Sequence, residues 1–211
     1  MNEYFDSTML KAISTANDIK KLCNDAKKYK FKAVCINPCY VSLAKELLKD
    51  TNVKVCTVIG FPLGANTTYI KVEEVRDAIN NGADEVDMVI NVGALKEKNY
   101  DYVINEIKKL REASYDKILK VIIETCYLTE EEIIKMTEIC NKTNVDFIKT
   151  STGFGTRGAS TNDIEIINKY KSNDLKIKAS GGIRTKDDAQ KYIELGVSRI
   201  GTSNAVKMME E

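Results

Sequence analysis

The chain has 211 residues, a length at which one large core or an α/β barrel is common. Its 32 basic and 31 acidic residues give a net charge of +1 and are spread along the chain, so the composition indicates neither a nucleic-acid partner nor a membrane surface. Histidine is absent, which excludes Ser-His-Asp and Cys-His mechanisms, imidazole metal sites and imidazole acid–base catalysis.

Short β-rich runs alternate with longer amphipathic runs in the first half of the chain. Apolar and β-branched residues predict strands over residues 4–7, 33–36, 53–61 and 85–90. Helical periodicity predicts helices over residues 16–29, 41–48, 68–80 and 100–112. Gly82 is expected to end the helix over 68–80 as a C-terminal cap. The apolar stripe of that helix is Ile70, Val72, Val75, Ala78 and Ile79.

The second half repeats the alternation. Strands are predicted over residues 119–124, 146–150, 175–180 and 198–202, and helices over 129–142, 162–170, 185–195 and from 204 onward. Thr129 and Glu132 form a capping box at the start of one of these helices. Eight strands and eight helices predict a (β/α)8 TIM barrel, with a doubly wound open sheet as the alternative. In a barrel, the site should lie at the carboxyl ends of the strands.

Linkers, low-complexity runs and a signal pattern are not seen, so we expect a single (β/α)8 barrel domain over residues 1–211. No apolar run approaches the ~18 residues of a spanning helix. The cysteines include no C-x-x-C pair and mostly lie in apolar runs, which indicates core thiols in a reducing, cytoplasmic compartment. They are Cys23, Cys35, Cys39, Cys56, Cys126 and Cys140.

A lysine, Lys149, ends the short strand that begins at Asp146. A buried ammonium is costly unless it is paired or loses its proton, and burial can lower the pKa of a lysine by up to ~3–5 units. A neutral amine attacks carbonyl groups, so a Schiff base could form here. The alternative is a strand-edge lysine whose ammonium reaches solvent.

Charged residues also interrupt two other apolar strands. Glu85 and Asp87 share one face of the fourth strand, and Lys176 and Lys178 share one face of the seventh. We interpret Glu85 and Lys176, nearer the strand starts, as structural charges or ion pairs. Lys178 should lie about 4.8 Å along the sheet from Lys149, where a second ammonium would favour a neutral amine. Asp87 would transfer protons and hold the protonated lysine.

Glycine-rich loops follow the last two predicted strands. Gly181 and Gly182 come after Ser180, and Gly201 precedes Ser203. Backbone N–H groups in such loops bind anions, and in this architecture the anion is commonly a phosphate. The loop after the sixth strand, with Thr152 and Gly153, would add further hydrogen-bond donors, although Ser and Thr are also ordinary residues at helix starts.

Motifs along nearly the whole chain resemble the deoxyribose-phosphate aldolase family of class I aldolases. The pair K-T-S-T-G and K-A-S-G-G in this order is highly specific. The motifs are F-D-S-T-M-L-K from Phe5, A-V-C-I-N-P from Ala33, V-C-T-V-I-G-F-P-L-G from Val55, G-A-D-E-V-D-M-V-I-N from Gly82, K-V-I-I-E-T from Lys120, F-I-K-T-S-T-G-F-G from Phe147, K-A-S-G-G-I-R from Lys178 and R-I-G-T-S from Arg199.

The resemblance implies reversible cleavage of 2-deoxy-D-ribose 5-phosphate to D-glyceraldehyde 3-phosphate and acetaldehyde, in deoxynucleoside catabolism, with neither metal nor organic cofactor. It implies a Schiff-base lysine at Lys149, a neighbouring lysine at Lys178 and an aspartate at Asp87 for proton transfer. It also implies that Gly181, Gly182 and Ser203 bind the phosphate and that Cys35 contacts the substrate. A contribution of Asp6 to the site is expected as well. The partner is then a phosphorylated sugar, and a homodimer is a candidate assembly.

The departures from the family pattern are local. Ser7 stands where many relatives have histidine, and Ala12 where they have proline. Two alternatives stay open: a non-catalytic phosphate-binding barrel, and a barrel aldolase or transaldolase with a different substrate. Retention of Asp87, Lys149 and Lys178 together argues against the first, because a protein without activity has no reason to keep costly buried charges.

Overall fold

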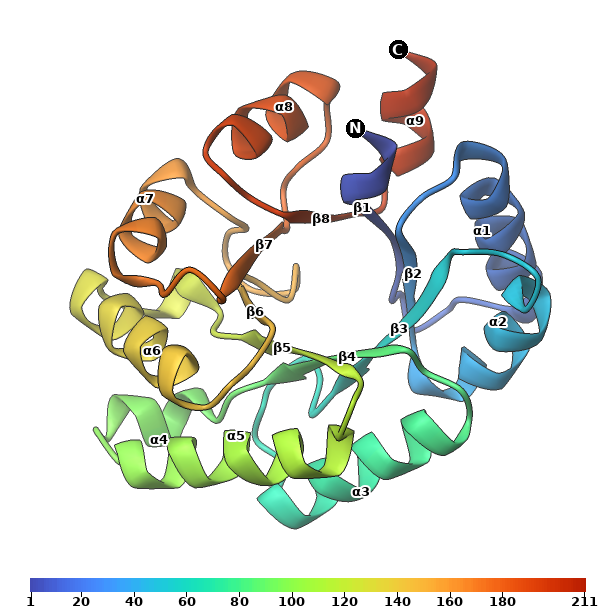
Figure 1. The fold of residues 1–211 in the computed structure, drawn as a ribbon. Helices are drawn as coiled ribbons and strands as arrows, with labels where there is room; N and C mark the ends of the chain where they lie inside the picture. The colour runs from blue at the N-terminus through green and yellow to red at the C-terminus, as the bar shows by residue number, and fades with distance from the viewer.

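Eight parallel strands close into a barrel in chain order, and the helices surround it (Figure 1). The computed structural model describes residues 1–211. β1 pairs with β2 on one side and with β8 on the other, which closes the sheet. The prediction of a (β/α)8 TIM barrel is confirmed, and the open-sheet alternative is wrong.

The strands lie where the sequence pattern places them, with ends that differ by one or two residues. The predicted strand over 53–61 stops earlier, because Gly60 has a φ of +61° and leaves the extended conformation. The strands are β1 (Phe5–Met9), β2 (Ala33–Ile36), β3 (Lys54–Ile59), β4 (Glu85–Val89), β5 (Ile118–Ile122), β6 (Phe147–Lys149), β7 (Lys176–Ser180) and β8 (Arg199–Thr202).

All eight predicted helices form, and a ninth, the five-residue α4, lies in the connection after β4, too short for a periodic pattern to indicate. The capping box of Thr129 and Glu132 is confirmed. The helices are α1 (Ala16–Tyr29), α2 (Val41–Leu48), α3 (Thr68–Asn80), α4 (Val92–Lys96), α5 (Tyr100–Ser114), α6 (Glu130–Lys142), α7 (Thr161–Tyr170), α8 (Lys186–Glu194) and α9 (Ala205–Glu210), with 3-10 turns at Asn2–Tyr4, Pro38–Tyr40 and Thr125–Tyr127.

The buried face of α3 differs from the predicted stripe. Val75 and Ala78 are buried, but Ile70 is 44% exposed and Lys71 is fully buried. The ammonium of Lys71 donates to Glu106 of α5 and to the carbonyl of Val89, which satisfies its charge inside the helix layer. Gly82 follows α3 with a φ of +102°, as a residue that ends a helix requires.

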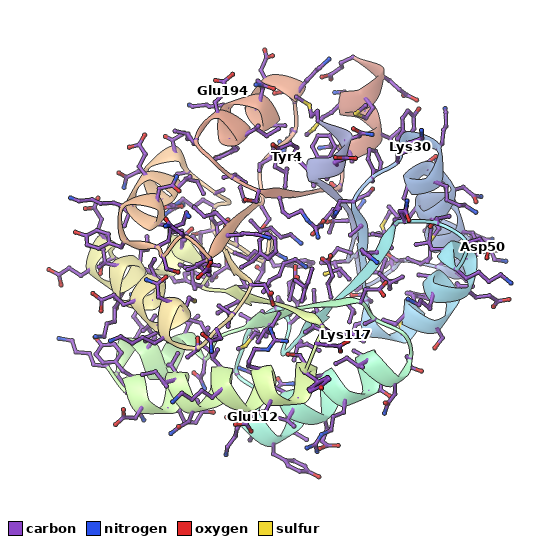
Figure 2. All side chains as sticks on the ribbon, viewed as in Figure 1. Tyr4, Lys30, Asp50, Glu112, Lys117 and Glu194 are labelled. Carbon is purple, nitrogen blue, oxygen red and sulfur yellow. The ribbon has the colours of Figure 1, made fainter.

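Apolar side chains fill the space between barrel and helices, in one cluster of 45 buried residues. Figure 2 shows that side chains also occupy the centre of the ring of strands. All six cysteines are free; four are buried as expected, whereas Cys39 is exposed and Cys126 half-buried. None of the helices combines the length and apolar character needed to cross a membrane.

Candidate active site

The interior of the barrel contains six buried charged side chains that are joined in a closed circuit of ion pairs, here called the charge ring. Alternation along the strands sends Glu85 and Asp87, two residues apart on β4, to the same interior face. Negative and positive groups alternate around the circuit. In order, its members are Glu85, Lys120, Asp87, Lys178, Asp6 and Arg199, which returns to Glu85.

One half of the charge ring is built on Lys120 of β5. Its Nζ lies 2.5 Å from Oε2 of Glu85 and 2.9 Å from Oδ1 of Asp87. The register of the sheet places Asp87 and Lys120 side by side on β4 and β5. Burial disfavours the charge of Lys120, but the two carboxylates outweigh this effect and raise its pKa well above the ordinary value.

The other half joins β1, β7 and β8. Nζ of Lys178 lies 2.5 Å from Oδ2 of Asp6 and 2.8 Å from Oδ2 of Asp87. Arg199 donates one Nη to Asp6 and the other to Oε1 of Glu85 at 2.5 Å. Within the charge ring, every carboxylate is therefore bonded to two cations of the ring, and every cation to two of its carboxylates.

These contacts keep the charge ring ionised despite its burial. Burial opposes the ionisation of Asp6, but the charges of Lys178 and Arg199 lower its pKa to about 2. Burial likewise opposes the charge of Asp87, and its lysine neighbours hold its pKa well below the ordinary value. The pKa of Lys178 is raised, because Asp6 and Asp87 outweigh the effect of burial.

Lys149 is a seventh ionisable side chain in the barrel interior, and it contacts the charge ring only through Asp87. Its Nζ lies 2.7 Å from Oδ2 of Asp87, which is its one hydrogen-bond partner in the protein. It pairs in register with Lys178, so the two lysines occupy neighbouring strands as the sequence predicts. Each cation of the charge ring is bonded to two carboxylates, whereas Lys149 is bonded only to Asp87, which it shares with Lys120 and Lys178.

Above Lys149, a cavity of about 450 Å³ opens between the loops that follow β1, β6, β7 and β8. Gly153, Gly181 and Gly182 adopt φ values of +89°, +80° and +75° at its wall. The backbone N–H groups of these three glycines and of Ser203 donate to no protein acceptor. The cavity therefore offers an amine at its base and free N–H donors at its wall.

Most of the predicted binding residues line this cavity. They are Thr152, Gly153, Gly181, Gly182, Gly201 and Ser203, together with Lys149 itself. The hydroxyl of Thr152 is already hydrogen-bonded to Glu124, so it supports the loop and is not a free donor toward the cavity. Lys11 and Arg184, which the sequence analysis did not select, add two cations to the lining.

Asp6 and Cys35, which are expected to contact the substrate, are not among the residues that line the cavity, and neither are Asp87 and Lys178. Asp6 is fully buried, and both of its carboxylate oxygens are taken by Lys178 and Arg199. Cys35 is also fully buried, and it packs with Cys56, its register partner on β3. Both residues therefore contact neighbouring side chains of the barrel interior and not the cavity wall.

The interpretation of the two charges near the strand starts is confirmed. Glu85 is a buried ion-pair partner of Lys120 and Arg199. Lys176 is exposed, and its ammonium lies 5.7 Å from the ring centre of Phe147, near the amino ends of the strands.

Sequence reasoning missed Lys120, Arg199 and Glu124. Lys120 and Arg199 begin or interrupt apolar strands, so the argument used for Lys149 would have identified both as costly buried cations. Glu124 is harder to find, since it lies just beyond β5 with a φ of +53°. There its carboxylate accepts the N–H of Thr152 at 3.2 Å and holds the loop after Lys149.

Two groups of metal-ligand type occur within the same interior. Their ligand atoms lie within 4.8 Å of one another, in Cys35, Cys56 and Asp87, and in Asp6, Cys56 and Glu85. All three carboxylates are already bonded to lysine or arginine in the charge ring. A cation bound there would compete with those side chains for the same oxygens.

The chain is similar to known aldolases over nearly its whole length. A family model described as DeoC/LacD family aldolase matches residues 2–205. Deoxyribose-phosphate aldolase of Treponema denticola is 52% identical over 211 residues, which covers 99% of this chain and 98% of the relative. The same enzyme of Dictyoglomus turgidum is 53% identical over 214 residues, with 99% and 98% covered.

A solved structure gives the same result. Deoxyribose phosphate aldolase from Aeropyrum pernix, described as a tetramer, has a TM-score of 0.91 and 31% identity, over 99% of this chain and 89% of that one. The family model and the full-length relatives both match nearly the whole chain. This chain therefore belongs to the DeoC/LacD family of aldolases.

Proposed function

We propose that the chain is a class I aldolase that reversibly cleaves 2-deoxy-D-ribose 5-phosphate to D-glyceraldehyde 3-phosphate and acetaldehyde through a Schiff base on Lys149. The reaction belongs to the breakdown of deoxynucleosides. Two relatives that are 52% and 53% identical to nearly the full chain are named deoxyribose-phosphate aldolase, which supports the proposal. The residues of the site supply the reason why this chain can perform it.

The observation that carries the proposal is the position of Lys149 relative to the charge ring. The ring holds three carboxylates and three cations, all buried, so its charges cancel without Lys149. A further ammonium would add an uncompensated positive charge to a low-dielectric interior, which is costly. Lys149 therefore shares Asp87 with two other lysines and has no carboxylate to itself, and its amine lies at the base of the cavity, where a carbonyl group of the substrate can reach it.

The cleavage follows from that amine. Nζ of Lys149 attacks C1 of the open-chain sugar, and the carbinolamine loses water to give an iminium ion. The C3 hydroxyl then loses its proton, the bond between C2 and C3 breaks, and the electron pair moves into the iminium to form an enamine. Glyceraldehyde 3-phosphate leaves, C2 is protonated, and hydrolysis of the second iminium releases acetaldehyde and restores the amine.

Asp87 and Lys178 are placed to move protons around this nitrogen. Oδ2 of Asp87 lies 2.7 Å from the nitrogen of Lys149 and 2.8 Å from that of Lys178. A proton can pass along this line as the carbinolamine forms and loses water. The lowered pKa of Asp87 and the raised pKa of Lys178 keep these groups as a carboxylate and an ammonium, so we assign Asp87 as the proton acceptor and Lys178 as the proton donor.

The glycine loops would bind the phosphate of the substrate. Gly181, Gly182 and Ser203 present free N–H groups to the cavity, and Gly153 presents another. Lys11 and Arg184 add positive charge at the same wall. An anion at one end and an aldehyde at Lys149 define a substrate with both groups, such as a sugar phosphate.

The alternatives are weaker. A non-catalytic phosphate-binding barrel has no use for Lys149 and for a charge ring of six buried ionised groups. A transaldolase or an aldolase with a different substrate shares the Schiff base, and a panel of phosphorylated aldehydes separates these activities. The iminium serves as the electron sink for bond cleavage, so the scheme requires neither a metal nor an organic cofactor.

Trapping of the intermediate tests the proposal directly. Borohydride reduction in the presence of acetaldehyde should add two carbons to the Lys149 peptide, as mass spectrometry of a digest would show. A matched sample of Lys149→Met should give no adduct. An adduct on Lys178 or Lys120 with an unmodified Lys149 would reject the assignment, and no adduct at all together with no turnover of 2-deoxyribose 5-phosphate would reject the activity.

We further propose that residues 1–211 form one domain that works in the cytoplasm as a homodimer. The free thiols of all six cysteines suit a reducing compartment. The relative from Aeropyrum pernix is described as tetrameric, which supports association of copies in this family. Light scattering after size exclusion measures the assembly of this chain.

A further inference from the structure

None of the six members of the charge ring lines the reaction cavity. Three of them, Glu85, Lys120 and Arg199, bond to neither Lys149 nor Lys178, and each is at most 3% exposed. Phe147 separates part of this group from the amino ends of the strands, with its ring centre 5.9 Å from the Lys120 ammonium and 5.7 Å from the Arg199 guanidinium. These residues cannot touch substrate, yet they add three buried charges beneath Lys149.

A structural role alone does not account for this arrangement. Replacing a buried ion-pair network by well-packed apolar side chains is often neutral or stabilising. The closed circuit has another property: every charge in it is balanced, so removal of any one member leaves a net unit charge of opposite sign inside the barrel. Two titratable side chains outside the circuit contact it: the amine of Lys149 donates to Asp87 at 2.7 Å, and the Cys56 thiol lies 3.1 Å from Asp87 and 3.5 Å from Lys120.

We propose that Glu85, Lys120 and Arg199 are positioning residues whose charges keep the ring at zero net charge and thereby decide the protonation of Lys149. The inference rests on the proposed Schiff-base function and adds the residues that set the working pH of the amine. Their action is electrostatic, so its direction depends on the sign of the charge removed. A purely structural role would give effects of one direction, whatever the sign.

The other polar groups around Lys149 do not supply this balance. Asp87 of β4 and Lys178 of β7 belong to the charge ring itself. Burial raises the pKa of the Cys56 thiol on β3, whereas a hydrogen bond from Cys56 lowers that of Cys35 on β2. Glu124 beyond β5 is engaged by Thr152. The charges of the ring are therefore the ones that a substitution can unbalance in a chosen direction.

Two substitutions of opposite sign test the inference. Lys120→Met leaves the ring with one excess negative charge, which holds the proton on Lys149, so the acidic limb of the activity profile should move to higher pH. Glu85→Gln leaves one excess positive charge, and the limb should move to lower pH. A change of one buried charge in this network should therefore alter the trapping rate at a fixed pH on the limb several-fold, in opposite directions in the two variants.

The double variant Glu85→Gln with Lys120→Met is the sharpest arm of the experiment. It removes one charge of each sign, restores zero net charge, and should return the limb to the wild-type pH. A matched control is Lys71→Met, which removes a fully buried lysine from its ion pair with Glu106 outside the barrel interior. This control should lower stability without moving the limb.

The measurement is the rate of borohydride trapping of acetaldehyde on Lys149 against pH, with folding checked by circular dichroism. Opposite shifts for the two single variants, cancelled in the double variant, support the inference. Shifts of the same direction, or none, overturn it while wild-type trapping still upholds the proposed function. Should Lys120→Met not fold, Glu85→Gln and the double variant still decide the question. Absence of trapping in the wild type would instead reject the function itself.

Discussion

Lys149 and Lys178 donate to the same oxygen, Oδ2 of Asp87, at 2.7 and 2.8 Å. The two lysines are register partners on β6 and β7, yet their surroundings differ. Lys178 has a second carboxylate, Asp6, at 2.5 Å, whereas Lys149 faces the cavity. One lysine is therefore held as a cation and the other is left to react.

Lys149→Arg should abolish turnover of 2-deoxyribose 5-phosphate. Arginine is a side chain of similar length, but its guanidinium is protonated at all usable pH values and cannot form a Schiff base. A coupled assay that follows glyceraldehyde 3-phosphate measures the loss. Activity within about tenfold of wild type, which corresponds to ~1.4 kcal/mol of barrier, would contradict the covalent mechanism.

Lys178→Leu should lower turnover by orders of magnitude and move the acidic limb of the pH profile upward. The variant leaves Asp6 and Asp87 with excess negative charge, which keeps the proton on Lys149. Lys176→Leu, an exposed lysine two residues away on the same strand, is the control and should leave the profile in place. A normal rate with an unmoved optimum in Lys178→Leu would show that the two lysines are not coupled.

Gly182→Ala should weaken binding of the phosphorylated substrate more than it lowers the maximal rate. A Cβ at this position meets no atom within 4 Å, so the methyl group stands in open space at a residue that lines the cavity. Gly182 also has a φ of +75°, where alanine is strained.

A matched control for that variant is Gly196→Ala, in the turn after α8. Its φ of +84° imposes similar strain, but Gly196 lies away from the phosphate loops and does not line the active-site cavity. The ratio of KM for 2-deoxyribose 5-phosphate to KM for unphosphorylated 2-deoxyribose measures the effect. An equal ratio in both variants would argue against phosphate binding by this loop.

Asp6→Asn should remove part of the acid dependence of stability. The pKa of Asp6 falls from an ordinary value of 3.8 to about 2 in the folded chain. A depressed pKa gives stability that is complete above pH 4 or so and is lost as the pH falls through the folded value. The difference corresponds to about 2 kcal/mol.

Urea unfolding of wild type and Asp6→Asn at several pH values measures this contribution. Near neutral pH the variant should be less stable by about 3–5 kcal/mol, because Lys178 and Arg199 lose a buried partner. The gap between the two proteins should narrow by about 2 kcal/mol on acidification. A gap that stays constant with pH would mean that Asp6 does not titrate with folding.

The alternation of apolar runs predicted the barrel well, because strand and helix periods are local properties of the chain. Differences arose where one residue changes the backbone, as at Gly60, or where an element is too short to show a period, as in α4. The buried face of α3 was partly wrong for another reason. A lysine, Lys71, is buried there, because Glu106 of a different helix neutralises it.

For the site, the sequence alone indicated the lysine that we propose as the Schiff-base residue, its neighbour and the glycine loops, because charges in apolar strands and glycines at strand ends are visible without a structure. Only the tertiary structure decided which charges balance which. Asp6 and Arg199 come from strands at opposite ends of the chain, and the closed barrel brings them within hydrogen-bond distance. Electrostatic compensation depends on distances across the barrel, and no pattern along the chain records those distances.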